Sequence, residues 1–500
     1  MEIKVEKGTI QSSAADTLIV NLFEGVTVPG GATGAVDQVL GGAISDLIAG
    51  GDLNGKAGEV AVIYPRGAIA ARRVLVVGLG KPDGFDLEGV RRAAATAIKR
   101  AGDLNADHVA TIVHGAGIGR LDVAQAAQAT VEGTLLAAYR FDAPKKREAS
   151  HDVSSLTIVE DDDHRIEAIT AGARTAEAVV AGVCLARDLV NMPPNVATPT
   201  RLAEAAEGIA FTHGMAVTIG GRDWAAERKM GAFLAVAKGA GEPPKFIVLG
   251  HHIDRTDLPT VALVGKGITF DTGGISLKAA ERMGDMKSDM GGAAAVLGAM
   301  EAVGRLGIPL RIIGITPATE NMPDANAYRP SDIITASNGK TIEIISTDAE
   351  GRMVLADALV HAETYHPDAV IDLATLTGAC VTALGSGVAA GIFCNNDALR
   401  ERLLAASEAT YERIWPLPLY EDYRRTINSD VADMKNSGGR SGGVGTSAVF
   451  LREFTNYPWA HLDIAGMALT EKGKEYTPVG GTGFGVRLLV AYLQGMADGR

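Results

Sequence analysis

Short apolar runs alternate with alanine-rich stretches through the first third of the chain. The apolar runs, at residues 59–64, 73–77, 108–113 and 155–160, are rich in β-branched residues and predict strands. The alanine-rich stretches, at residues 90–101 and 124–139, predict helices. Strands that alternate with helices in this way are typical of an α/β domain.

A longer alanine-rich stretch at residues 164–190 predicts a helix that Pro193 and Pro194 stop. Beyond it we predict strands at residues 246–249, 261–264, 312–316, 342–345, 369–373 and 460–464, and helices at 292–305, 353–365, 396–408 and 482–494. The turn sequence S-N-G-K at 337–340 predicts a hairpin, and therefore a mixed sheet. We expect a smaller α/β domain over residues 1–165, and over residues 166–500 a larger α/β/α domain with a mixed, mostly parallel central sheet.

The net charge limits which partners the chain can have. It is −13, from 47 basic and 60 acidic residues, and this argues against a general affinity for nucleic acid or anionic membranes. A local basic patch would still allow nucleic-acid binding. The N-terminus has no basic region followed by an apolar segment, and no apolar run approaches the ~18 to 20 residues that span a bilayer. We therefore expect a cytoplasmic protein that binds no membrane.

The most informative polar stretch is Ser346 to Arg352, which reads S-T-D-A-E-G-R. Asp348, Glu350 and Arg352 occupy alternate positions after the apolar run 341–345, so an extended backbone would point all three side chains to one side. Two carboxylates that lie close together are costly unless a cation or a proton lies between them. The stretch therefore predicts a metal site whose other ligands come from elsewhere.

Two further blocks carry charged residues in loops that follow predicted strands or begin a predicted helix. The block from Val264 to Lys278 contains Lys266 and Asp271, and the loops that leave strands are where ligands bind in open α/β sheets. Taken alone, Asp271 could be a turn aspartate that merely pairs with Lys266. The block M-K-S-D-M-G-G contains Asp289, which taken alone fits an N-cap or a first-turn acid of the following helix better than a ligand, unless it lies near the other acids.

The three blocks together hold an excess of acids. They offer four carboxylates and three basic groups: Asp271, Asp289, Asp348 and Glu350, with Lys266, Lys278 and Arg352. All ten histidines lie outside the blocks, and the three cysteines form no Cys-x-x-Cys pair. An oxygen-rich set with bridging carboxylates suits two divalent cations.

In this order the blocks closely resemble the motifs of the leucyl aminopeptidase family, the cytosolic di-metal aminopeptidases. The matching stretches are VGKGITFDTGGISLK, MKSDMGGAA, STDAEGR and DLATLTGA (372–379), and residues 137–142, 187–195, 432–440, 459–466 and 482–489 agree as well. The resemblance covers residues 180–500 at the family's spacing, whereas the first 160 residues match less sharply. It implies a hydrolase, a metalloprotease that removes N-terminal residues from peptides.

The resemblance also implies what each residue does. The metal ligands would be Lys266, Asp271, Asp289, Asp348 and Glu350, with Asp271 and Glu350 bridging the two ions. Lys278 would polarise the scissile carbonyl, and Arg352 would hold a bicarbonate ion that acts as the general base. Lys266 would have to bind as a neutral amine, because an ammonium group has no lone pair to share.

Substrate and assembly are implied in the same way. Two ions of Mn²⁺ or Zn²⁺ would bind the free α-amine and the carbonyl of the peptide and activate a water molecule. Thr375, Leu376 and Gly378 would line the substrate cleft, and Met286 with Ala465 would border the pocket for the first side chain. That apolar wall favours leucine-like residues with broad specificity, because one methylene changes discrimination by only about 1 to 3 kcal/mol. The resemblance further implies a homohexamer.

Two departures from the family pattern leave the substrate preference open. Ser346 stands where the motif usually begins with Asn, and the small Ala468 stands where related pockets can carry a larger side chain.

Two other functions compete with peptide cleavage. A di-metal phosphoester hydrolase shares bridging carboxylates and metal-activated water, although such sites often use histidine. A non-catalytic binding protein on the same fold is the other, although the full set of ligands argues against it.

Overall fold

The computed structural model describes residues 1–117, 119–142, 152–439 and 441–499. The chain divides into two compact units: unit 1 is Met1–Val180 with Lys472–Pro478, and unit 2 is Ala181–Glu471 with Val479–Arg500. The division falls inside helix α5 (Asp163–Asn191), which ends just before Pro193 and Pro194 as predicted. The functional domain boundary between residues 165 and 166 stays a prediction.

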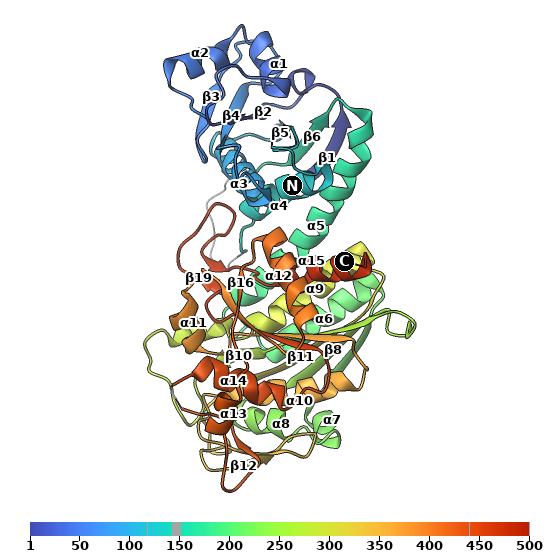
Figure 1. The fold of residues 1–500 in the computed structure, drawn as a ribbon, viewed down its shortest axis with the longest axis vertical. Helices are drawn as coiled ribbons and strands as arrows, with labels where there is room; N and C mark the ends of the chain where they lie inside the picture. The colour runs from blue at the N-terminus through green and yellow to red at the C-terminus, as the bar shows by residue number, and fades with distance from the viewer. Residues whose placement is uncertain (118, 143–151, 440, 500) are drawn as a thin grey trace. The chain divides into compact units, whose positions relative to one another are not determined.

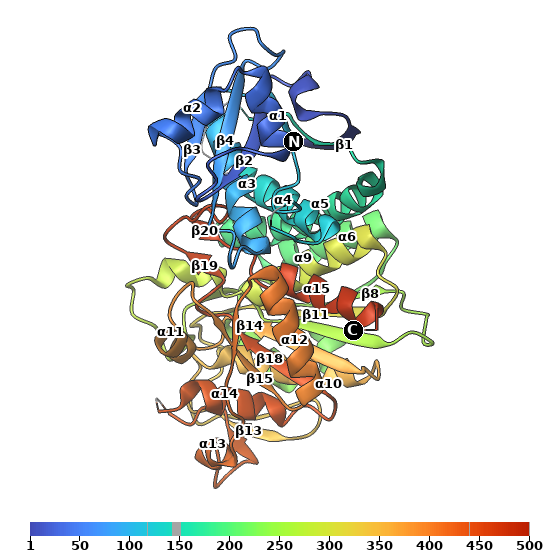
Figure 2. The same ribbon diagram turned by 45° about the horizontal axis from the view of Figure 1, so that its top comes forward.

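Unit 1 is built on one sheet with the strand order β1-β6-β5-β2-β4-β3 (Figures 1 and 2). Its strands are β1 (Glu2–Lys7), β2 (Thr17–Phe23), β3 (Val60–Ile63), β4 (Arg73–Gly80), β5 (His108–Thr111) and β6 (Ser155–Glu160), and its helices include α1 (Gly31–Val39), α2 (Ala43–Gly50), α3 (Leu87–Asp103) and α4 (Val123–Ala138). Only the β3–β4 pair is antiparallel among the described strand pairs of this sheet. β3 to β6 confirm the predicted strands, whereas β1 and β2 have no counterpart in the prediction.

Helices cover both faces of the unit 1 sheet because its central strands are apolar on both sides. In β2, Leu18 packs with Val36 of α1 and Ile44 of α2, whereas the next residue, Ile19, packs with Ala97 of α3. Successive side chains of a strand point to opposite faces, so a continuous apolar run such as β2 needs cover on both. The result is the predicted α/β domain, with helices on both faces of its sheet.

Unit 2 is organised around a larger sheet with the order β16-β15-β18-β14-β9-β11-β8-β7, with β10 also paired to β11. Its strands are β7 (Ala216–Gly220), β8 (Lys245–His251), β9 (Thr260–Gly265), β10 (Gly267–Asp271), β11 (Arg311–Asn321), β14 (Ala369–Ala374), β15 (Ala390–Cys394), β16 (Ile414–Pro416) and β18 (Trp459–Asp463). The run β18-β14-β9-β11 is parallel, whereas β8 pairs antiparallel with both β11 and β7, and β15 pairs antiparallel with β18. The sheet is therefore mixed and mostly parallel, as predicted.

Helices pack on both faces of this second sheet. The helices of this unit include α6 (Pro199–His213), α7 (Arg222–Glu227), α8 (Gly231–Val236), α9 (Gly291–Leu306), α10 (Glu350–Glu363), α11 (Gly378–Leu384), α12 (Asp397–Thr410), α13 (Glu421–Thr426), α14 (Gly443–Arg452) and α15 (Val486–Ala497). On β11, Gly314 faces Met300 of α9, whereas Ile313 and Ile315 pack into a core that contains Val354 of α10. Neighbouring positions on one strand thus meet helices of opposite layers, which gives the α/β/α arrangement.

The predicted hairpin forms, but it does not explain why the central sheet is mixed. β12 (Ile333–Thr335) and β13 (Thr341–Glu343) pair antiparallel across the S-N-G-K turn. They belong to a separate sheet of order β12-β13-β17, because β13 pairs with β17 (Met434–Lys435) on its other side. The antiparallel pairs of the central sheet come instead from β7, β8 and β15.

By length and average composition helix α5 could cross a membrane, although charged residues such as Arg174 and Glu177 interrupt its apolar residues. Half of its most apolar 18-residue window is buried inside the protein. The core helix of a soluble protein passes the same test, so this feature is weak evidence for a membrane span.

Candidate metal centre

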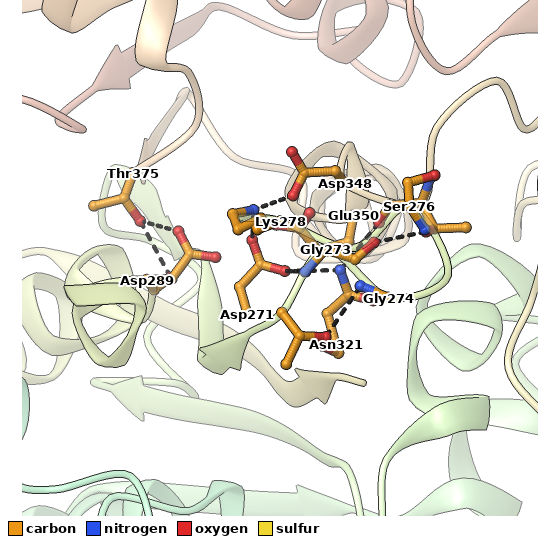
Figure 3. A network of polar contacts seen from close by, with 12 residues as sticks. Asp271, Gly273, Gly274, Ser276, Lys278, Asp289, Asn321, Asp348, Glu350 and Thr375 are labelled. Carbon is orange, nitrogen blue, oxygen red and sulfur yellow. Dashed lines mark hydrogen bonds and ion pairs between the residues drawn. The ribbon is translucent and has the colours of Figure 1, made fainter. Parts of the chain in front are cut away.

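The three predicted blocks converge at one edge of the unit 2 sheet. Lys266 follows β9, and Asp271 is the last residue of β10. Asp289 lies between the 3₁₀ helix η3 (Met283–Ser288) and α9, and Asp348 and Glu350 lie at the start of α10. Neighbouring parallel strands end at the same edge of a sheet, which brings loops that are distant in sequence together. Figure 3 shows Asp271 and Asp348 beside Lys278, and Asp289 farther left next to Thr375.

The backbone of the S-T-D-A-E-G-R stretch is not extended, so that part of the prediction is wrong. α10 begins at Glu350, and Ala349 before it has φ −112° and ψ 40°. Asp348 is about 40% exposed at its side chain, whereas the Glu350 side chain is 2% exposed. The two carboxylates still reach one site, because the turn into the helix carries Glu350 inward while Asp348 stays at the rim.

Lys266 lies between two of the acids. Its Nζ is 2.8 Å from Oδ1 of Asp289 and 2.8 Å from Oε1 of Glu350, and it donates to the Thr375 carbonyl at 3.1 Å. A Cβ on Gly351 would lie 2.6 Å from Cε of Lys266, so the glycine of the motif makes room for the lysine. The lysine therefore pairs with Asp289 and Glu350. The alternative that Lys266 merely pairs with Asp271 is wrong.

Lys278 contacts the other two acids. Its Nζ is in close contact with Oδ2 of Asp271 and Oδ1 of Asp348. Oδ1 of Asp271 accepts hydrogen bonds from Gly273 N and Asn321 Nδ2, both at 2.8 Å. The bond from Gly273 is the one expected of a turn aspartate, so Asp271 acts in a turn and in the cluster at once.

Asp289 does not cap the helix that follows it. α9 begins at Gly291 after Met290, and no side chain caps it. The carboxylate of Asp289 instead accepts from Thr375 Oγ1 at 2.8 Å as well as from Lys266. The N-cap alternative is therefore wrong, because the side chain turns towards β9 and β14.

The donor set fits a divalent cation. Asp271, Asp348 and Glu350 each offer an oxygen, and these oxygens lie within 4.8 Å of one another. Oε2 of Glu350 is buried and accepts no hydrogen bond from any described residue. A buried carboxylate oxygen without a partner is costly, and a hard cation with oxygen ligands would satisfy it.

The pKa values show how crowded the charges are. Burial, together with the charge on Glu350, raises the pKa of Asp271 to about 6, and burial also raises the pKa of Asp289. Burial acts against ionised Glu350 too, but Lys266 and Lys278 outweigh it and hold the pKa of Glu350 at about 2. The acids in turn outweigh the burial of both lysines and raise their pKa values, so the two ammonium groups balance the acids here.

Arg352 lies near the acids but binds none of them in the described residues. Its Nη1 donates to the Asn436 carbonyl at 2.7 Å, and its Nε is buried without a described partner. Burial lowers the pKa of Arg352 to about 10. An unpaired guanidinium N–H of this kind is a donor for an anion.

Comparison with known proteins identifies the chain. The model of the cytosol aminopeptidase family catalytic domain matches residues 184–490, and the model of that family's N-terminal domain matches residues 19–148. The chain belongs to the cytosol aminopeptidase family. The probable cytosol aminopeptidase of Roseiflexus castenholzii is 46% identical over 499 residues, 99% of each chain. The chain is accordingly a metal-dependent aminopeptidase, a hydrolase of peptides.

Solved structures of the family agree with the fold. A tomato leucine aminopeptidase variant superposes with a TM-score of 0.87 at 35% identity, over 99% of this chain and 96% of that one. The bottromycin maturation enzyme BotP in complex with Mn superposes with a TM-score of 0.84 at 37% identity, over 97% of this chain and all of the other. Both the two-part α/β architecture and the dependence of the family on divalent metal are therefore shown.

The predicted substrate residues come from three segments of unit 2. Met286 lies in η3, partly buried. Thr375 and Leu376 follow β14, Gly378 begins α11 and is exposed, and Ala465 follows β18. Leu376 packs against the hydrophobic core. Their role in binding stays a prediction for this member of the family.

The two departures from the family pattern are accommodated locally. Ser346 Oγ accepts a hydrogen bond from Asp348 N at 3.2 Å, as a side-chain oxygen does in a Ser or Asx turn. Ala468 is buried, and a Cβ on Gly291 would lie 2.9 Å from its Cβ, so a larger side chain at 468 would meet the start of α9.

Several residues that support the site have no motif of their own. Asn321, at the end of β11, donates from Nδ2 to Asp271 and to the Thr347 carbonyl at 3.0 Å. Tyr328 OH donates to the same carbonyl at 2.9 Å. The signal that could have found Asn321 is a polar residue directly after a buried apolar strand, the criterion that drew attention to the three blocks.

Proposed function

We propose that the chain removes leucine-like N-terminal residues, with broad specificity, from peptides with the help of two divalent cations. The observation that carries the proposal is the buried Oε2 of Glu350, which accepts no hydrogen bond from the described residues although two lysines lie nearby. We assign Lys266, Asp271, Asp289, Asp348 and Glu350 as the residues that would hold the metal, and Asp271 and Glu350 as the two that would serve both ions.

Lys266 has to change its protonation state to take this role. In the structure its Nζ is a donor to Asp289 and Thr375, and the surrounding acids favour the ammonium form. An ammonium group has no lone pair, so Lys266 must release its proton before it can bind a cation. Metal uptake by this chain is therefore coupled to proton release.

When bound, the two cations would act as Lewis acids and lower the pKa of a water molecule towards ~7. Water adds to the carbonyl carbon, the peptide C–N bond breaks, and the leaving nitrogen takes a proton. Lys278, with its ammonium group beside Asp271 and Asp348, would hold the negative charge that develops on the carbonyl oxygen. Arg352 would hold a bicarbonate ion through its Nε, which has no partner in the described residues, and a bicarbonate ion held there would supply a general base.

The substrate would be placed by main chain and small apolar surfaces. Thr375, Leu376 and Gly378 would run along the peptide, and Met286 with Ala465 would border the first side chain. The free α-amine of the peptide would be bound by the proposed cations. The need for this amine is why cleavage would begin at the N-terminus.

We further propose Mn²⁺ or Zn²⁺ as the metal, a homohexamer as the assembly and the cytoplasm as the location. Oxygen-rich sites accept several divalent metals, so availability selects among them. The relatives named cytosol aminopeptidases support a cytoplasmic location. The charge of −13 supports a protein that binds neither anionic membranes nor nucleic acid in general, although a local basic patch would allow the latter.

The test is an assay of Leu-p-nitroanilide after chelation and after Mn²⁺ or Zn²⁺ is restored. An N-acetylated analogue and p-nitrophenyl phosphate serve as matched substrates. We expect metal-dependent cleavage of the free-amine substrate only. Equal cleavage of the N-acetylated analogue would refute the exopeptidase assignment, and cleavage of the phosphoester alone would favour the phosphoester hydrolase.

A further inference from the structure

Two main-chain segments assigned to the substrate leave neighbouring parallel strands. Leu376 follows β14, which ends at Ala374, and Ala465 follows β18, which ends at Asp463. β14 and β18 pair in parallel with Ala374 opposite Asp463, so the two segments start level with each other. Their separation is therefore decided by what joins them just beyond the sheet.

Asp463 joins these two segments. Its side chain is completely buried, and Oδ1 accepts from Leu376 N at 3.3 Å, Thr377 N at 3.4 Å and Ala465 N at 3.2 Å. Oδ2 accepts from Thr377 Oγ1 at 2.6 Å. One carboxylate thus receives hydrogen bonds from both sides of the assigned substrate path.

A carboxylate suits this position because of its chemistry. Its two oxygens offer about four acceptor sites, and as an ionised acceptor it makes stronger hydrogen bonds than a neutral group. Burial raises the pKa of Asp463 above its ordinary value, while His461 on the same strand and the donors from Thr377, Ala465 and Leu376 oppose this. An amide in its place could accept with one oxygen only.

Asp463 is also separate from the acids of the candidate metal centre. Its four side-chain hydrogen bonds all go to residues 376, 377 and 465, and in the described residues none goes to a proposed metal ligand. Thr377 Oγ1 in addition accepts from Cys380 N at 3.0 Å and so caps α11. The carboxylate, the loop after β14 and the start of α11 form one connected unit.

We propose that Asp463 is a positioning residue that holds the main chain of Leu376 and Ala465 at the separation the peptide needs. The inference rests on the proposed function and assigns this function a residue outside the metal centre. Removal of the carboxylate would loosen both segments in the free enzyme and in every later state alike. Such a loss of uniform binding raises KM and leaves kcat nearly unchanged.

The test compares Asp463→Ala with Asp372→Ala in the full-length, metal-loaded protein. Asp372 is an equally buried acid on β14, but it accepts from Trp459 Nε1 and His461 Nδ1, both at 2.6 Å, and in the described residues its side chain makes no hydrogen bond to either substrate segment. For Leu-p-nitroanilide we expect Asp463→Ala to raise KM about tenfold with kcat within about threefold of the wild type. Asp372→Ala should leave KM unchanged.

Two milder variants keep the proposal testable if Asp463→Ala does not fold. Asp463→Asn retains one acceptor oxygen, and Thr377→Val removes only the 2.6 Å bond and the cap on α11. Each should raise KM about threefold and weaken binding of L-leucine, measured by calorimetry, by a similar factor. Metal content by mass spectrometry should equal that of the wild type.

The outcomes separate the two proposals. If the wild type cleaves Leu-p-nitroanilide and the Asp463 variants have the same KM as the wild type, only the positioning role is overturned. An equal rise in KM for Asp372→Ala would also overturn it, since this would show a general loss of stability. A fall in kcat at constant KM for the Asp463 variants would overturn it as well. A wild type that does not cleave the substrate would overturn the proposed function and this inference with it.

Discussion

Each unit of the molecule buries a cluster of acidic and basic side chains, and the two clusters differ in how their oxygens are used. In unit 1, Glu132 accepts from Arg91 Nε and Gln128 Nε2, both at 2.7 Å. Glu88 accepts from Arg92 Nε at 2.9 Å and Tyr476 OH at 2.8 Å. All four of these carboxylate oxygens have donors, and Arg91 contacts both acids.

In unit 2, four acids share two lysines, and Oε2 of Glu350 has no donor among the described residues. The pKa of Asp271 rises to about 6 through burial and the charge on Glu350. The comparison teaches that burial and ion pairing alone do not mark a functional site. A surplus of buried acid with an unpaired oxygen does, because such an arrangement costs stability unless a ligand completes it.

The largest effect should come from Glu350→Ala. We expect it to lose bound metal and to reduce kcat/KM about a thousandfold or more, because it removes the oxygens assigned to both ions. The matched variant Lys278→Ala should retain the metal and lose about 10²- to 10³-fold in kcat, the usual cost of a lost oxyanion donor. Metal content by mass spectrometry and steady-state kinetics measure both. Full activity of Lys278→Ala would contradict its assignment.

The unit 1 cluster should respond in stability instead of in metal content. Glu132→Ala leaves the buried guanidinium of Arg91 without its closest acid, and we expect the free energy of unfolding to fall by about 3 to 5 kcal/mol. Urea denaturation measures this, and metal content should not change. Glu2→Ala is the control, because the exposed Lys4–Glu2 pair should contribute less than about 1 kcal/mol. A loss of metal in Glu132→Ala would break the comparison.

Removal of the metal should affect only the unit 2 cluster. Chelation should speed amide hydrogen exchange in peptides that cover residues 266–278 and 346–352, since metal at 100 times its Kd stabilises the bound form by about 2.7 kcal/mol. Peptides from α3 and α4 should exchange as before. Mass spectrometry with and without chelator gives both results in one sample. Faster exchange in α3 and α4 would mean that the two clusters are coupled.

The smallest of the four effects concerns Asn321. Its Nδ2 donates a hydrogen bond of 2.8 Å to Oδ1 of Asp271 and so orients that carboxylate. Asn321→Ala should weaken metal binding about 10- to 100-fold, as the loss of residues that orient metal ligands does. Asn326→Ala is the control, because the exposed Asn326 bonds only to Asp324 in the described residues. Calorimetric titration of the metal-free protein measures the affinity. Equal affinities for the two variants would remove Asn321 from the site.

Much of the fold could be predicted because the elements repeat a simple pattern. Buried parallel strands read as apolar runs and their crossover helices as alanine-rich stretches, so β4 to β6 and most of the central sheet were within reach. β1 was not, because it is an edge strand with mostly exposed side chains. The hairpin at 337–340 was predicted locally, but which sheet it joins depends on β17, about a hundred residues away.

The candidate site was predictable as a set of residues and not as an arrangement. The three blocks follow strand ends, so their convergence could be expected from the rules of open α/β sheets. Asn321 has no motif of its own, and although Asp463 lies in the matching stretch 459–466, both resemble other polar residues at strand ends. Their importance appears only from the hydrogen bonds they make across the sheet.

By itself, the sequence determined that Ser346 to Arg352 belongs with the other two blocks to a set with more acid than base, because the composition of each block and its place next to a strand or helix are local properties of the chain. The tertiary structure decided that Lys266 pairs with Asp289 and Glu350 while Lys278 pairs with Asp271 and Asp348. It also decided that Glu350 begins a helix and turns inward. Ion pairing depends on distances of a few ångströms between segments far apart in sequence, and only the folded chain sets those distances.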